Sequence, residues 1–181
     1  MTTTGQQVDA WALNLVNEAI AANLMPDNLD ADLRSNITRE QFAGITVKLY
    51  EAMSGTIVPT PALADNIFTD TSNADVRKAY SMGFVSGTSS TTFSPNSPLN
   101  REQAAVMLAN VYKAMGGIIS TRNPGTFSDD ASISGWAKNA VYFMAENGII
   151  SGVGNNRFSA QGKTQSQAAL AIALKMLQNL K

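Results

Sequence analysis

The chain has 181 residues, a formal net charge of −1 and a sequence pI of about 5.3, with 44% hydrophobic and 15% charged residues. No basic stripe is present, which argues against nucleic acid and anionic membranes as partners. Cysteine and histidine are absent, which excludes disulfides, thiolate or imidazole metal ligands, and catalysis by either side chain. No apolar run reaches the length needed to cross a bilayer. We therefore expect no metal, no cofactor and no membrane insertion.

Residues 1–5 contain neither the basic segment nor the apolar segment of a signal peptide. Two origins stay open from the residues alone: a cytoplasmic protein, or a mature segment with an added methionine.

The first part of the chain predicts two helices. Residues 8–22 carry apolar side chains at helical spacing, namely Val8, Trp11, Ala12, Leu15, Val16, Ala19 and Ile20. A polar loop follows Pro26. A second, longer helix opens at Thr38, which forms a capping-box pattern with Gln41. A linker with two prolines then covers residues 56–66.

The same order recurs twice more. A short helix is predicted around 73–82 and another at 136–147, and each is stopped by the glycine that follows it, Gly83 or Gly148. Longer helices are predicted at 101–115, capped by Asn100, and at 166–180.

The long helices show a repeat with a period of about 62–65 residues. The apolar face of the first, Phe42, Ile45, Leu49, Tyr50 and Met53, maps onto apolar residues in both later copies. Val16, Val76 and Val141 correspond in the short helices, and Trp11 corresponds to Trp136. One helix pair cannot bury its apolar face alone, so we predict an all-α, pseudo-threefold bundle of three helix–loop–helix repeats.

The predicted boundaries follow from this period. The first repeat spans 1–55, the second 67–116 and the third 126–181, with linkers at 56–66 and 117–125. The three repeats are expected to share one compact domain.

A charge pattern at the start of the long helices points to a ligand. Arg101 stands in the first turn, where the helix dipole disfavours a cation. A cation beside free backbone N–H groups suits an anion. Arg39 repeats the pattern, whereas the third copy has Ser166 at this position. A surface arginine paired with its neighbouring carboxylate or with a carbonyl is the alternative.

These residues together resemble the S-layer homology domain in three tandem copies. The resemblance rests on Phe-x-Asp, Trp, Gly-Ile-Ile-Ser-Gly, Phe-x-Pro and Thr/Asn-Arg-Glu. It implies a three-pronged module with grooves between copies, which anchors an exported protein to a secondary cell-wall polysaccharide, often one bearing a pyruvate ketal. The implied location is extracellular, at the cell wall, and the chain is expected to be fused to or assembled with other surface domains.

The resemblance also implies which residues contact the polysaccharide. The arginines of the repeated motif come first, with their neighbouring glutamates: Arg39, Glu40, Arg101 and Glu102. The other candidates are Trp11, Asp70, Ser86, Gly87, Asp129, Trp136, Ser151 and Gly152.

Most of these candidates also have a structural reading. Glu40 and Glu102 are expected to orient the arginines or to cap the helix rather than to act as catalysts. The two tryptophans are expected to be half-buried core residues, with stacking on a sugar as the alternative. Asp70 and Asp129 are expected to cap or brace the helix that follows each of them. Gly87 and Gly152 are expected to adopt positive φ in a tight turn.

Two departures from the family pattern are visible. The third copy has Gln165-Ser166-Gln167 in place of the charged Arg-Glu pair, and the first copy lacks the Gly-Ile-Ser-Gly and Phe-x-Pro elements. At most two grooves are therefore expected to hold an anion.

Two other functions stay open. A glycan-cleaving enzyme would use a pair of carboxylates from Glu40, Glu102, Asp70 and Asp129, about 5–9 Å apart. A structural module for self-assembly or protein docking would need no glycan.

Overall fold

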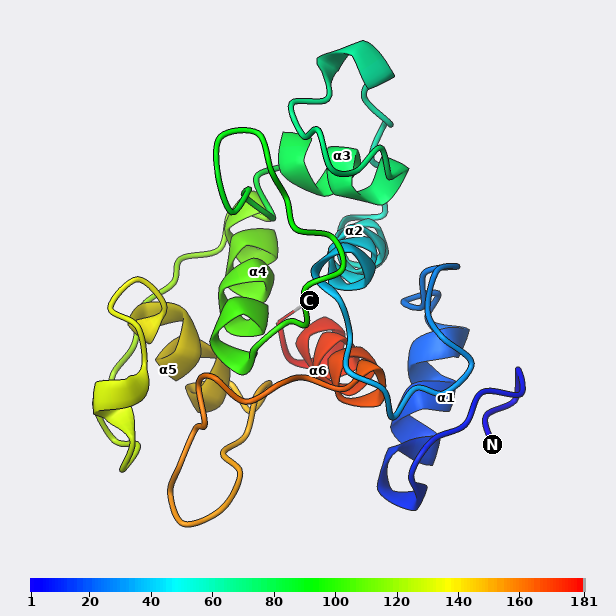
Figure 1. Ribbon diagram of the computed structural model, residues 1–181. Helices are drawn as coiled ribbons and strands as arrows, with labels where there is room; N and C mark the ends of the chain where they lie inside the picture. Colours follow the sequence, from blue (N-terminus) through cyan, green and yellow to red (C-terminus); the bar gives the residue numbers. More distant parts are fainter. Residues whose placement is uncertain (181) are drawn as a thin grey trace.

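A computed structural model describes residues 1–180, and this part of the chain is all-α, as predicted (Figure 1). It contains α1 (Leu13–Ala21), α2 (Arg39–Ser54), α3 (Ala74–Ser81), α4 (Arg101–Ala114), α5 (Lys138–Glu146) and α6 (Ser166–Asn179), with short 3-10 helices η1 (Ala10–Ala12), η2 (Leu63–Asp65) and η3 (Asp130–Ser132). Within residues 1–180 no helix has the length and apolar character required to traverse a bilayer.

The three long helices, α2, α4 and α6, occupy the centre, and the short helices lie outside them (Figure 1). Each short helix packs against the long helix of the preceding repeat: α3 against α2, and α5 against α4. The first short helix, α1, packs against the last long helix, α6, which closes the ring. The predicted pseudo-threefold bundle is confirmed, and its helix pairs are built from neighbouring repeats.

A ring of backbone hydrogen bonds lies where the three repeats meet. The amide of Ile37 donates to the carbonyl of Thr164 at 2.8 Å, that of Leu99 to Ile37 at 2.9 Å, and that of Thr164 to Leu99 at 3.0 Å. These three residues precede α2, α4 and α6 at corresponding positions. The divergent first repeat is therefore tied into the ring in the same way as the other two.

The core contains most of the apolar residues that the repeat predicts, although Met115, at the position of Met53, is 36% exposed. Val16, Val76 and Val141 are fully buried, as are Phe93 and Phe158. Burying a side chain of this size contributes about 1.5–3 kcal/mol. The periodic positions are thus what hold the six helices together.

The predicted caps of α2 and α4 and the glycine stop after α3 are also confirmed, whereas the helix predicted over 8–22 is shorter, with η1 at Ala10–Ala12 and α1 at Leu13–Ala21. Thr38 with Gln41, and Asn100 with Gln103, form complete capping boxes at the starts of α2 and α4. Gly83 follows α3 with a φ of 72°, which is a left-handed conformation that glycine adopts without strain.

Candidate functional site

Arg39 begins α2 and reaches across to the loop of the second repeat. Its Nε donates to the carbonyl of Phe93 and its Nη2 to the carbonyl of Ser86, both at 2.9 Å. The guanidinium carbon lies 4.7 Å from the centroid of the Phe93 ring, within cation–π range. The side chain is buried, and this burial lowers the pKa of the Arg39 guanidinium below its ordinary value. Arg39 is therefore an inter-repeat tie as well as a candidate ligand group.

Arg101 repeats these contacts one repeat later. Its Nε donates to the carbonyl of Phe158 at 2.9 Å and its Nη2 to that of Ser151 at 2.5 Å. Its guanidinium carbon lies 4.9 Å from the centroid of the Phe158 ring. Burial lowers the pKa of this guanidinium too.

The backbone amides at these helix starts are occupied, contrary to the sequence expectation. The amide of Arg39 donates to Ser97 and that of Glu40 to Pro95, at 3.0 and 3.1 Å. In α4 the amide of Arg101 likewise donates to the carbonyl of Gly162 at 3.0 Å. The loop of the next repeat satisfies the groups that an anion would otherwise use, so anion binding here depends on side chains.

Glu40 and Glu102 brace neighbouring repeats. The hydroxyl of Thr71 donates to Glu40 at 2.5 Å. Glu102 is only 2% exposed and accepts from the amide and hydroxyl of Ser134, both at 2.9 Å, and from Gln161 at 2.8 Å. These contacts favour a bracing role over direct contact with a ligand.

The third repeat has the same brace with its charge on the other partner: an uncharged glutamine replaces the glutamate and contacts an aspartate. Gln167, at the position of Glu102, is fully buried, and its Nε2 donates to the carboxylate of Asp9 at 2.7 Å. The amide of Asp9 donates back to Gln167 at 2.9 Å. This pair was missed from the sequence because its members are 158 residues apart.

Asp70 and Asp129 each hold the loop that leads into the long helix of their own repeat. The expectation that they cap or brace the short helix directly after them was wrong. Asp70 accepts from the amides of Phe93 and Ser94, at 2.8 and 2.7 Å, and Asp129 accepts equivalently in the third repeat. The side chain that caps α3 is Asn73.

These amides affect both carboxyl groups. The hydrogen bond from the Phe93 amide is the main reason why the pKa of Asp70 lies below its usual value. Burial would raise the pKa of Asp129, but the amides of Phe158 and Ser159 outweigh it and lower that pKa as well.

Gly87 and Gly152 lack the positive φ that was expected of them. Glycine is required here because of close packing. A Cβ on Gly87 would lie 2.4 Å from the carbonyl oxygen of Ser89, and one on Gly152 would lie 2.8 Å from that of Arg157. Both distances are too short for any other residue unless the loop shifts.

The two tryptophans are exposed, so the expectation of half-buried core residues was wrong. Trp136 is 61% exposed and Trp11 is 56% exposed. Trp136 precedes α5 and forms one wall of a hollow beside Arg39.

This hollow has a volume of about 200 Å³, and we call it the Arg39 groove. It combines α2 of the first repeat, the loop and long helix of the second, and the start of the third. Its lining consists of Arg39, Phe84, Val85, Ser86, Gly87, Thr88, Gln103, Val106, Met107, Asn110 and Trp136. The structure therefore brings together four of the predicted residues, Arg39, Ser86, Gly87 and Trp136.

The corresponding hollow at Arg101 is almost filled. Its volume is about 20 Å³, enough for about one water molecule. Ala168 and Ile172 line it at the positions that Gln103 and Met107 occupy in the Arg39 groove.

The interface between the third and first repeats has no arginine at the start of the long helix. Ser166 is fully buried at that position, and its hydroxyl has no hydrogen-bond partner within residues 1–180. The arginines of the first and second repeats each hold the Ser-Gly loop of the next repeat, and the first repeat lacks that loop. The two departures in the sequence, the missing arginine of the third repeat and the missing loop of the first, therefore lie at the same interface, between the third and first repeats.

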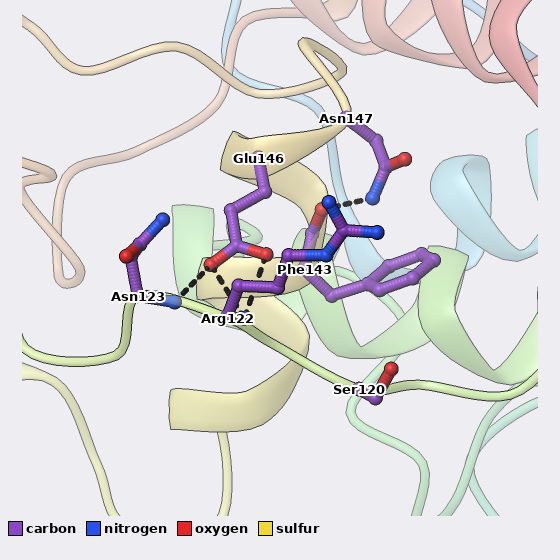
Figure 2. A pocket seen from close by; sticks show the side chains of 6 residues that line it. All are labelled: Ser120, Arg122, Asn123, Phe143, Glu146 and Asn147. Carbon is purple, nitrogen blue, oxygen red and sulfur yellow. Dashed lines mark hydrogen bonds between the residues drawn. The ribbon is translucent and has the colours of Figure 1, made fainter.

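A larger hollow, of about 530 Å³, lies elsewhere, between the second linker and the end of α5 (Figure 2). There Glu146 accepts hydrogen bonds from the amides of Arg122 and Asn123, at 3.0 and 2.7 Å, and the amide of Arg122 is the main reason why the pKa of Glu146 lies below its usual value. The side chain of Asn147 donates to the carbonyl of Phe143 at 2.8 Å. None of the predicted site residues lines this hollow.

Comparison with known proteins agrees with the repeat. Two segments, residues 68–105 and 126–164, match the S-layer homology domain. They cover the loops that Arg39 and Arg101 hold, together with the Arg-Glu pair of α4.

Three curated relatives also align with this chain. An amylopullulanase of Thermoanaerobacterium thermosulfurigenes is 27% identical over 94% of this chain, and exoglucanase XynX of Acetivibrio thermocellus is 28% identical over 91%. A surface-layer 125 kDa protein of Lysinibacillus sphaericus is 34% identical over 45% of this chain. The chain spans only 9%, 15% and 6% of the lengths of these relatives.

Proposed function

We propose that this chain is a non-catalytic anchoring module whose Arg39 groove binds an anionic secondary cell-wall polysaccharide. The observation that carries the proposal is the groove itself, where a buried arginine, a Ser-Gly loop and an exposed tryptophan line one hollow. A polysaccharide that bears a pyruvate ketal offers both a carboxylate and sugar rings to such a site.

The chemistry of the groove suits that ligand. The two carbonyl contacts of Arg39 leave Nη1 and one hydrogen of Nη2 free of bonds to residues 1–180, and together these can face a carboxylate. No carboxylate lines the groove. The side-chain amide groups of Gln103 and Asn110 offer hydrogen bonds to sugar hydroxyls. The exposed indole of Trp136 offers an apolar face to a sugar ring.

The Arg101 site contributes less in this proposal. Its guanidinium makes the same carbonyl contacts, but the hollow beside it lacks room for a sugar. We assign Arg101 mainly to holding the third repeat in place, with one principal binding groove in the chain.

The proposal includes a divergent first copy of the domain. Two relatives align over more than nine-tenths of the chain, and the backbone ring joins all three repeats, which supports three copies with the boundaries 1–55, 67–116 and 126–181. The small share of each relative that the chain spans supports a role as one module of a larger cell-surface protein.

A carboxylate-based hydrolase fits less well. Glu102 is buried among three hydrogen-bond donors, and the pKa of both Asp70 and Asp129 is lowered, whereas a general acid needs a raised one. The candidate carboxylates therefore have structural partners.

A pull-down on whole cell-wall sacculi tests the proposal. Sacculi of the three relatives' organisms are compared before and after chemical removal of the secondary polysaccharide. Retention that is lost on removal is expected. Equal retention on stripped sacculi would overturn the secondary polysaccharide as the ligand. Concentration-dependent self-assembly without any retention would favour an interaction module instead.

A further inference from the structure

The Arg39 groove continues into a second hollow along α4. That hollow has a volume of about 180 Å³ and shares Val106, Asn110 and Trp136 with the first. Its remaining lining is Ala109, Lys113, Ile119, Asn139 and Ala140. Trp136 belongs to both hollows, so its exposed side chain lies at the point where they join.

The two hollows follow one face of α4. Gln103 lines the first, Asn110 lines both and Lys113 lines the second, at spacings that place them on the same side of a helix. From Gln103 to Lys113 the helix rises about 15 Å. A track of this length exceeds a single pyranose ring.

Each hollow has one cation and no carboxylate. Arg39 serves the first and Lys113 the second, and neither forms an ion pair within residues 1–180. Asn110 and Asn139 supply neutral amides between and beside them. The whole track therefore favours a polar chain that carries negative charge.

The chain contains its own comparison. The corresponding hollow at the α2–α3 pair has Glu51 at the position of Lys113 and Asp75 at the position of Ala140. Asp27, Lys48 and Lys78 line it too, and Lys78 lies 3.9 Å from Glu51, so this hollow, unlike the other, contains carboxylates that an anion would face. Burial raises the pKa of Asp75 there. Thr71 stands at the position of Trp136. The features that suit an anionic sugar chain therefore occur together at the α4–α5 pair and are replaced at the α2–α3 pair.

We infer that the second hollow is a second sugar subsite, in which Lys113, Asn139 and Trp136 hold the unit next to the one bound at Arg39. This inference rests on the proposed function, since it names the length of glycan that the same groove reads. Lys113 also lies in the last turn of α4, where a cation stabilises the helix dipole. That role alone would affect stability and leave binding unchanged.

The test uses wall polysaccharide released from sacculi of the relatives' organisms by enzymatic digestion, which preserves acid-labile ketals, and separated into one-sugar and two-sugar fragments. Binding is followed by ¹⁵N NMR titration of the whole chain. A one-sugar fragment is expected to shift the amide of Gly87 and the indole of Trp136, and a two-sugar fragment is expected to shift Lys113 and Asn139 as well.

Lys113→Glu, which copies Glu51, should weaken the two-sugar fragment about tenfold and change the one-sugar fragment less than about twofold. Lys163→Glu makes the same change of charge on an exposed loop outside both hollows and should leave both fragments unchanged. Equal effects of Lys113→Glu on both fragments, or no effect on either, would overturn the second subsite alone. If wild type binds no fragment from any of the three organisms, the proposed function itself fails.

Discussion

Arg39 and Phe93 contact each other in two ways: the guanidinium donates to the Phe93 carbonyl at 2.9 Å, and its carbon lies 4.7 Å from the centroid of the Phe93 ring. The contacts join the first repeat to the second. Arg101 and Phe158 repeat them between the second and third. The motif arginine therefore acts in the fold as well as in the proposed binding.

Arg39→Ala should lower the free energy of unfolding by about 2–3 kcal/mol, because two carbonyls lose a charged donor. Arg39→Lys should recover little of this loss, since an ammonium lacks the planar fork that reaches both carbonyls and the ring. Urea denaturation measures both. Arg34→Ala is the control, because Arg34 forms an exposed ion pair with Asp32 that solvent screens, so its loss should change stability little. Equal losses for Arg39→Ala and Arg34→Ala would contradict the tie.

Glu102→Gln should destabilise the protein by about 1–3 kcal/mol. All three partners of Glu102 donate hydrogen bonds, so an amide group would bring a donor to face another donor. Gln167 is tolerated at the corresponding position because its partner Asp9 has a carboxylate that accepts. The reverse substitution, Gln167→Glu, should also be destabilising, because it would place a second carboxylate against that of Asp9. A stable Glu102→Gln variant would show that the brace contributes little.

Gly87→Ala should destabilise the second repeat by about 1–3 kcal/mol, because the new Cβ would overlap the carbonyl oxygen of Ser89. Gly135→Ala is the matched control, since a Cβ there meets nothing within 4 Å, and its effect should stay within about 0.5 kcal/mol. Thermal unfolding of the two variants side by side would refute the packing argument if their midpoints agreed.

Much of this architecture is readable from the sequence because its signals are local. The apolar spacing of Phe42, Ile45 and Leu49, the capping box at Thr38 and the stop at Gly83 each depend on residues within a few positions. These features predicted the helices and their order, and the repeat of about 62–65 residues predicted the threefold arrangement.

The contacts between repeats depend on residues far apart in the sequence and could not be predicted from local signals. The packing of α1 against α6, the pair Asp9–Gln167 and the capture of helix amides by the next loop all cross repeats. The exposure of Trp136 also depends on how α5 lies on α4. The sequence shows the missing arginine of the third repeat and the missing loop of the first as separate departures, and only the fold places both at the interface between these two repeats.

Stability should fall in acid through Asp70 and Asp129. The folded pKa of each lies below the unfolded value of about 3.9, so their contribution is complete above that pH and is lost as the pH falls through the folded value. Asp129→Asn should therefore lower the melting temperature near neutral pH and flatten its decline between about pH 5 and pH 2. An unchanged slope in this range would show that other groups govern the acid transition.

The most direct test of the account compares Trp136→Ala with Trp11→Ala. The two tryptophans occupy corresponding positions and are similarly exposed, at 61% and 56%, but the open groove beside Arg39 has only Trp136 in its lining. Titration of released wall polysaccharide into each variant should show an affinity loss of about tenfold or more for Trp136→Ala and a near-wild-type affinity for Trp11→Ala. Equal affinities for the two variants would contradict the assignment of binding to the Arg39 groove.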